Sequence, residues 1–121
     1  MPKTLYKIST SLIIALGSVH VLFTIPAYGR WTLNAMWFAG SGLAIVFAGF
    51  LNLALLRAGG SDGVVRLLCL FTNLLVALLF TAALSLLTEP QVYLGLALFI
   101  FETVGVLMLG RADGATAGKD G

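Results

Sequence analysis

Four side chains that could take part in chemistry lie inside stretches of sequence that are otherwise apolar. They are His20, Asn52, Asn73 and Glu102, one in each of four stretches. A carboxylate or an imidazole can carry a proton or contact a ligand, and the two amides can donate and accept hydrogen bonds. Glu102 is the most unusual, because the surrounding segment "ALFIFETVGVLML" holds no other charged residue. These four residues, with Thr24, form our candidate ligand- or proton-binding site.

The composition indicates that these stretches lie in lipid. Of the 121 residues, 60% are hydrophobic and only 10% are charged, and the mean hydropathy is +1.04. A soluble domain carries about 25% charged residues. We therefore predict an integral membrane protein whose main partner is the lipid bilayer. A nucleic-acid partner is not expected, because the net charge is only +2 and the basic residues are spread along the chain.

The four apolar stretches are long enough to cross a membrane as helices. Crossing a hydrocarbon core of about 30 Å takes about 20 helical residues. Short segments rich in Gly and Pro separate the stretches, and short connections make neighbouring helices antiparallel. The sequence predicts an all-α, up-down-up-down bundle of four transmembrane helices in a single domain, residues 1–111, with a disordered polar tail at 112–121. The predicted helices cover residues 5–25, 33–56, 64–87 and 92–109.

The basic residues predict the orientation of this bundle. With both chain ends on one side, that side holds six of the seven Lys and Arg residues, and the other side holds Arg30. Because basic residues are enriched in cytoplasmic loops, we predict that both termini are cytoplasmic and that the protein lies in the cytoplasmic membrane of a bacterium. Tyr6 is then expected near the inner membrane interface. An aromatic belt is expected near the outer one, formed by Tyr28, Trp31, Trp37 and Tyr93.

Small residues near the polar ones predict that the polar residues face the interior of the bundle. Small side chains on one stripe let membrane helices approach closely. In the fourth stretch one seam holds Gly95, Leu98, Glu102, Gly105 and Leu109. In the second, a four-residue repeat holds Gly40, Ala44, Ala48 and Asn52.

Glu102 needs a partner if it faces the interior. An ionised carboxylate inside a membrane is costly, so we expect Glu102 to be protonated, paired with a charge or hydrogen-bonded. Asn73 is the first candidate partner, because a rise of about 1.5 Å per residue places it at a depth similar to that of Glu102. His20 is the second candidate, through a water or a bound ligand.

Three classes of function are compatible with these features. The first is a protein that binds or transports a small ligand or a proton through the polar residues. Because so narrow a bundle leaves little room for a pore, transport would favour a homodimer. The second is an accessory or structural subunit of a larger membrane complex. The third is a membrane-embedded enzyme acting on a lipid-soluble substrate, with Glu102 and His20 as acid and base; we rank it last, because these two residues lie at different depths.

Neither a metal site nor a cofactor is expected. His20 and the single cysteine, Cys69, lie in different stretches and do not supply the four ligands of a closed metal site. Haem held by two histidines would require a second chain. The chain resembles small multidrug transporters and small fluoride channels in size and helix count. The first of these families carries a glutamate in its first helix, whereas this chain has His20 there and its acid in the fourth, so the resemblance covers the layout alone.

Overall fold

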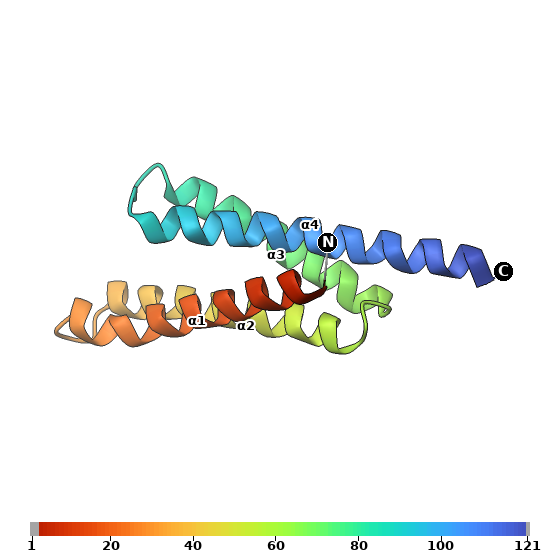
Figure 1. The fold of residues 1–121 in the computed structure, drawn as a ribbon. Coiled ribbons are helices and arrows are strands. Elements are labelled where there is room, and N and C mark those ends of the chain that lie inside the picture. Colours follow the sequence, from red (N-terminus) through yellow and green to blue (C-terminus); the bar gives the residue numbers. More distant parts are fainter. Residues whose placement is uncertain (1–2, 121) are drawn as a thin grey trace.

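The computed structural model describes the backbone of residues 3–120 and the side chains of residues 3–109. The described chain folds into four α-helices joined by short connections (Figure 1). All four are long and apolar enough to cross a membrane, which suggests an integral membrane protein, as predicted. The helices are α1 Lys3–Ala27, α2 Leu33–Arg57, α3 Gly63–Ala83 and α4 Pro90–Asp120.

Local sequence explains most of the helix boundaries. The Thr32 side chain accepts a hydrogen bond from the backbone N–H of Ala35 at the start of α2, and the Asp62 carboxylate accepts two at the start of α3. Pro90 is the first residue of α4. A backbone N–H at this position would have no hydrogen-bond partner within the helix, so the absence of one in proline costs nothing. Two boundaries differ from the prediction. The third helix ends at Ala83, not at residue 87, and α4 continues as helix to Asp120, through most of the tail that we expected to be disordered.

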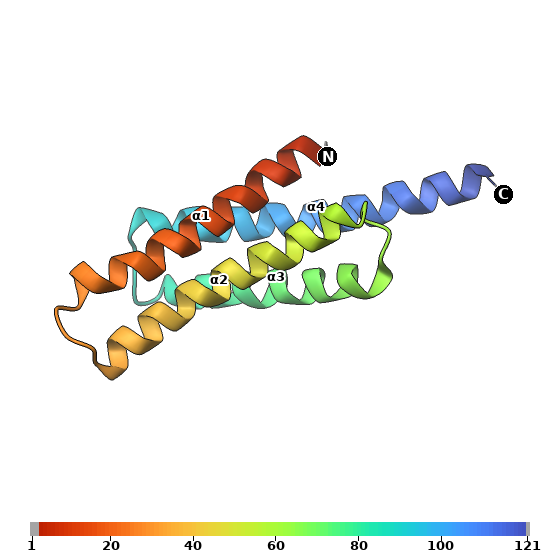
Figure 2. The same ribbon diagram turned by 90° about the horizontal axis from the view of Figure 1, so that it is seen from below.

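The helices form two antiparallel hairpins that pack against each other. α1 packs mainly on α2, and α3 mainly on α4, while smaller contacts of α2 with α3 and of α1 with α4 join the two pairs. Figure 1 shows the two hairpins as separate layers, and both Figure 1 and Figure 2 show the start of α1 and the end of α4 toward the same end of the bundle. We call α1 with α2 the first hairpin and α3 with α4 the second.

The first hairpin is held together by a close approach of its two backbones. A Cβ atom built on Gly17 of α1 would lie 2.8 Å from the backbone nitrogen of Val46 and 2.9 Å from the carbonyl oxygen of Gly42, both in α2. The four-residue repeat of small residues in α2 lies on the contact face only in its second half: Gly40 and Ala44 are exposed, whereas Ala48 and Asn52 are buried. A spacing of four residues drifts by about 40° per step around a helix, so such a stripe leaves the contact face.

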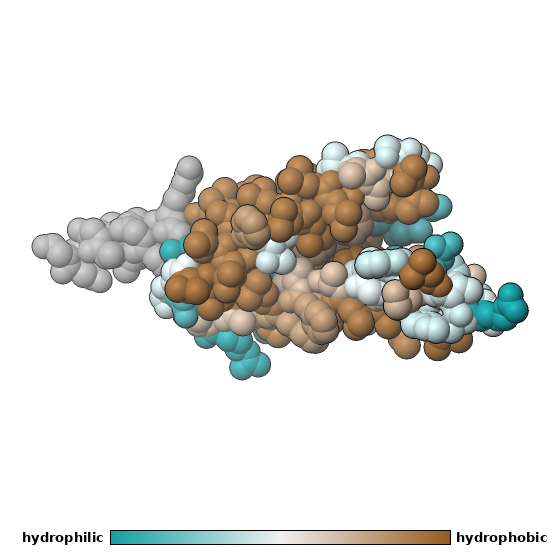
Figure 3. Space-filling view, turned by 180° about the vertical axis from the view of Figure 1, so that it is seen from behind, coloured by the Kyte–Doolittle hydropathy of each residue, from teal (hydrophilic) through white to brown (hydrophobic). Residues whose placement is uncertain are grey.

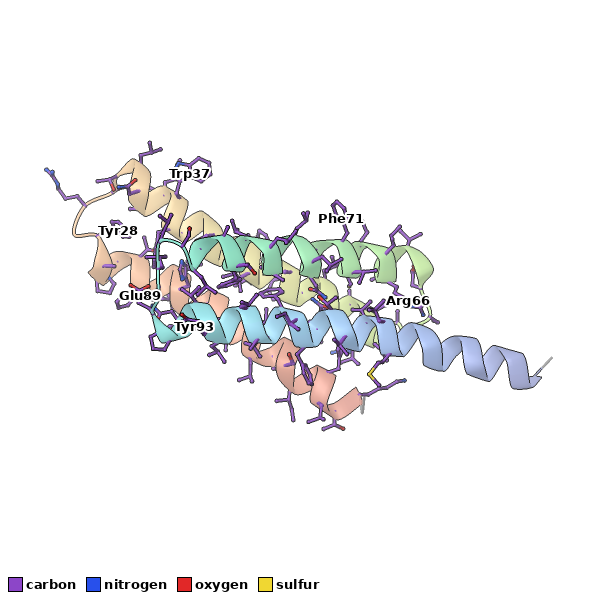
Figure 4. All side chains as sticks on the ribbon, turned by 90° about the horizontal axis from the view of Figure 1, so that it is seen from above. Tyr28, Trp37, Arg66, Phe71, Glu89 and Tyr93 are labelled. Carbon is purple, nitrogen blue, oxygen red and sulfur yellow. The ribbon has the colours of Figure 1, made fainter. Side chains whose placement is uncertain are left out.

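The outside of the bundle is apolar between two more polar ends. Large exposed side chains such as Phe71 cover the middle of the helices, and the space-filling view shows broad hydrophobic surface there (Figure 3). Figure 4 places Tyr28, Trp37 and Tyr93 toward the end of the bundle opposite Arg66. An apolar waist with aromatic residues toward one end suits a protein surrounded by lipid.

Candidate functional site

Six buried polar side chains from all four helices meet between the two hairpins. Each is at most 3% exposed. Three come from α1 alone, and each of the other helices supplies one. We call this group the polar cluster: Tyr6, Ser9, Thr10, Asn52, Asn73 and Glu102.

The two asparagines form a reciprocal pair of hydrogen bonds between the hairpins. Nδ2 of Asn52 donates to Oδ1 of Asn73 over 2.8 Å, and Nδ2 of Asn73 donates to Oδ1 of Asn52 over 2.9 Å. The hydroxyl of Tyr6 donates to the same Oδ1 of Asn52 over 2.6 Å. Asn52 also donates to the carbonyl oxygen of Ala48 within its own helix. These bonds tie α1, α2 and α3 together.

Glu102 is sealed inside the bundle but only half of its carboxyl group is hydrogen-bonded. The residue is 0% exposed, which confirms that it faces inward, and its predicted seam of small and apolar residues is buried with it. The Thr10 hydroxyl donates to Oε1 of Glu102 over 3.0 Å. Ser9 and Tyr6 lie beside the same carboxyl. Neither Oε2 of Glu102 nor Oγ of Ser9 has a hydrogen-bond partner, so an unused acceptor and an unused donor lie close together.

The predicted partners of Glu102 are both wrong. Asn73 pairs with Asn52, and the hydroxyl of Thr10 bonds to Glu102 in the position that we expected for Asn73. His20 is outside the polar cluster: its Nε2 lies 3.1 Å from Oγ of Ser41, and its ring stacks on Phe38 with 3.8 Å between centroids. The physical reason is distance along α1, because His20 lies ten residues beyond Thr10, or about 15 Å.

Thr24, the fifth predicted residue, also lies apart from the cluster. It is buried one turn beyond His20, and its hydroxyl is 3.4 Å from the carbonyl oxygen of His20 in the same helix. The structure therefore brings together three of the five predicted residues, Asn52, Asn73 and Glu102. The other two predicted residues, His20 and Thr24, lie in α1 near the other end of the bundle.

Three members of the cluster, Tyr6, Ser9 and Thr10, were missing from the predicted site. A signal was available, because positions i, i+3 and i+4 share one face of a helix and the buried Ile13 continues that face. Hydroxyl groups are weaker markers than a carboxylate, since Ser and Thr often bond to their own helix backbone. Tyr6 was expected near the inner membrane interface; the structure shows that its side chain faces the bundle interior, 1% exposed and bonded to Asn52.

The polar cluster is buried away from the surface, since each of its members is at most 3% exposed. Neither of two grooves on the surface of the described residues is lined by a member of the cluster. The groove near the α1–α2 connection has a volume of about 450 Å³ and includes Thr24, Tyr28 and Arg30. In the part of the chain with described side chains, no group of three His, Cys, Asp or Glu residues could hold a metal ion.

Similarity to other proteins adds nothing to this geometry. The chain matches no protein-family model, no curated protein and no solved structure. The chemistry open to the cluster therefore follows from its own groups. A carboxyl group can hold or release a proton, neighbouring hydroxyls can bond to either form, and a pair of amides can hold two helix pairs in register.

Proposed function

We propose that the protein is a small integral membrane protein in which Glu102 binds and releases a proton, and that the change in charge alters the packing of the two hairpins. Proton-coupled transport and proton-coupled ligand binding both depend on a change in conformation of this kind. The observation that carries the proposal is the environment of Glu102: fully buried, with one oxygen bonded to Thr10 and the other without a partner. Acidic residues inside membrane spans mark proton relays and substrate pathways.

A proton fits this site better than a small molecule does. The groups nearest the carboxyl are the hydroxyls of Thr10, Ser9 and Tyr6, which carry no positive charge to balance an ionised acid. An unbalanced charge in the bundle is costly, so Glu102 holds its proton in the closed conformation. A protonated carboxyl also has a donor of its own, for which Oγ of Ser9 is a free acceptor.

The position of the cluster links this proton to movement. The Thr10–Glu102 bond joins α1 to α4, and the Asn52–Asn73 pair joins α2 to α3, so both cross from one hairpin to the other. Within the first hairpin the close backbone contact at Gly17 keeps α1 and α2 together. When Glu102 loses its proton, the carboxylate favours water over its present surroundings, and the hairpins separate enough to hydrate it.

The distribution of basic residues and the width of the bundle indicate where the protein lies in the cell and how it would assemble. We place both termini in the cytoplasm and the protein in a bacterial cytoplasmic membrane, because six of the seven basic residues then lie on the cytoplasmic side. A single bundle this narrow leaves little room for a pore, so transport would favour a homodimer.

The distance between the hairpins, measured over a range of pH, tests this function. Spin labels at residues 29 and 89 report on the two helix connections, one in each hairpin, in the full chain reconstituted in lipid. In the wild-type protein the distance should increase from mildly acidic to mildly alkaline pH. Glu102→Gln keeps the shape of the protonated acid but cannot ionise, so it should hold the short distance at every pH.

A matched control separates Glu102 from the other acids. Asp62→Asn removes a carboxylate that caps α3 outside the polar cluster, and this variant should respond to pH as the wild type does. If the wild type and Glu102→Gln give the same distance at every pH, Glu102 is a packing residue. An accessory role in a larger complex then becomes the better explanation of the chain.

A further inference from the structure

A basic groove lies between the start of α1 and the end of α2, away from the polar cluster. It has a volume of about 320 Å³. Three of its lining residues are cations, Lys3 and Lys7 from α1 and Arg57 from α2. Two half-buried leucines and a threonine complete it, so that charge and apolar surface share one cavity. The full lining is Lys3, Thr4, Lys7, Leu53, Leu56 and Arg57.

The charges of this groove are not balanced by its other walls. None of the six lining residues is acidic. Lys3 and Lys7 are one helical turn apart on one face of α1, and Arg57 approaches from the neighbouring helix. Three like charges around one cavity repel each other, and an anion between them removes that cost. An arginine fork and two ammonium groups are the usual ligands of a phosphate group.

The apolar part of the groove distinguishes a lipid from a free anion. Leu53 lies one turn deeper in α2 than Arg57, which is about 6 Å toward the middle of the bundle. Lys3 and Arg57 are at the helix ends, where lipid headgroups lie, and Leu53 is one turn deeper, toward the level where acyl chains begin. A soluble anion would gain nothing from Leu53 and Leu56, whereas a phospholipid would contact both parts.

We infer that this groove binds one acidic phospholipid, with its phosphate among Lys3, Lys7 and Arg57 and the start of an acyl chain along Leu53 and Leu56. The enrichment of basic residues on one side of a membrane protein explains why cations lie at this end, but it does not bring three of them, from two helices, to one cavity. The lipid joins α1 to α2 at the end of the hairpin that is farthest from their connection. The inference is independent of the role proposed for Glu102.

Lipid retention measured by native mass spectrometry tests the inference. The full chain is reconstituted in vesicles of phosphatidylcholine with a minor share of phosphatidylglycerol, then extracted gently. The wild type should retain one phosphatidylglycerol. Each basic residue contributes about fivefold to the affinity for an acidic membrane surface. The triple variant Lys3→Gln, Lys7→Gln and Arg57→Gln should therefore bind roughly 100-fold more weakly.

The control is Arg30→Gln, which removes one positive charge at the opposite end of the bundle and should retain the lipid as the wild type does. If the triple variant does not insert, the single variants Lys3→Gln and Lys7→Gln test the same claim, each with a loss of about fivefold. Equal retention by the variants and the wild type would overturn the inference. So would an equal loss in Arg30→Gln, or complete displacement of the lipid by inorganic phosphate, which would indicate a site for a free anion.

Discussion

The hydroxyl of Thr10 in α1 donates a hydrogen bond to the carboxyl of Glu102 in α4, 3.0 Å away, across the boundary between the two hairpins. The two residues are 92 positions apart in the sequence, so only the packing of the hairpins brings them together. The bond occupies one oxygen of Glu102 and leaves the other without a partner. This half-bonded, sealed carboxyl is the central feature of the molecule.

Removing the Thr10 hydroxyl should weaken the contact between the hairpins. Thr10→Val keeps the shape of the side chain and removes its only donor, so the free energy of unfolding in detergent should fall by about 1 kcal/mol, as for interhelical hydrogen bonds in other membrane proteins. Thr103→Val is the matched control, because the Thr103 hydroxyl bonds to Phe99 in its own helix. The account is contradicted if the two variants lose the same stability.

The asparagine pair should show strong coupling in a double-mutant cycle. Asn52→Leu or Asn73→Leu alone leaves the other amide buried without its partner and should cost about 1–3 kcal/mol of stability. The double variant removes both amides, and its loss should be clearly smaller than the sum of the single losses. Unfolding in detergent measures all three values. Additive losses would mean that the reciprocal bonds do not form in the folded protein.

The fold was largely predictable from the sequence, because each span had to be long, apolar and helical. The direction in which Glu102 points was predictable for the same reason, since a carboxylate facing lipid would be costly. The end of the third helix was harder: the apolar run continues to Leu87, while the structure ends α3 at Ala83 with a turn. Hydropathy alone does not distinguish a helix from an apolar turn.

The partners within the site were not predictable in the same way. Depth counting brought Asn73 to the level of Glu102, but it gave no rotation of one helix relative to another. The rotation of α1 turns Thr10 and Ser9 toward the carboxyl, while His20 lies near the other end of the bundle. Which helix supplies the partner depends on how the hairpins pack, and that information is spread over many apolar side chains.

A methyl group at Gly17 should disturb the first hairpin. In Gly17→Ala the new Cβ would lie under 3.0 Å from backbone atoms of both Val46 and Gly42, so the helices must move apart. We expect a loss of about 1–3 kcal/mol, typical of overpacking. Gly40→Ala in α2 is the control, because its Cβ would meet nothing within 4 Å. Unfolding in detergent compares the two, and equal stability would argue against the close contact.

The proposed orientation predicts which connections can be labelled from each side of the membrane. In a Cys69→Ala background, Ser61→Cys should react with a membrane-impermeant thiol reagent only from the cytoplasmic side. Gly29→Cys should react only from the outside, and a Cβ at this position meets nothing within 4 Å. Labelling of whole cells and of inverted vesicles gives the answer. The reverse pattern would place both termini outside.

The protonation of Glu102 is the claim on which the functional account depends. Infrared spectroscopy of the full chain in lipid at neutral pH measures it directly, because the carbonyl stretch of a protonated carboxyl group is separate from the bands of an ionised carboxylate. We predict a protonated-carboxyl band in the wild type that is absent from Glu102→Gln and unchanged in Asp62→Asn. If the wild type shows no such band at neutral pH, Glu102 is ionised inside the bundle, and the proposed proton site is wrong.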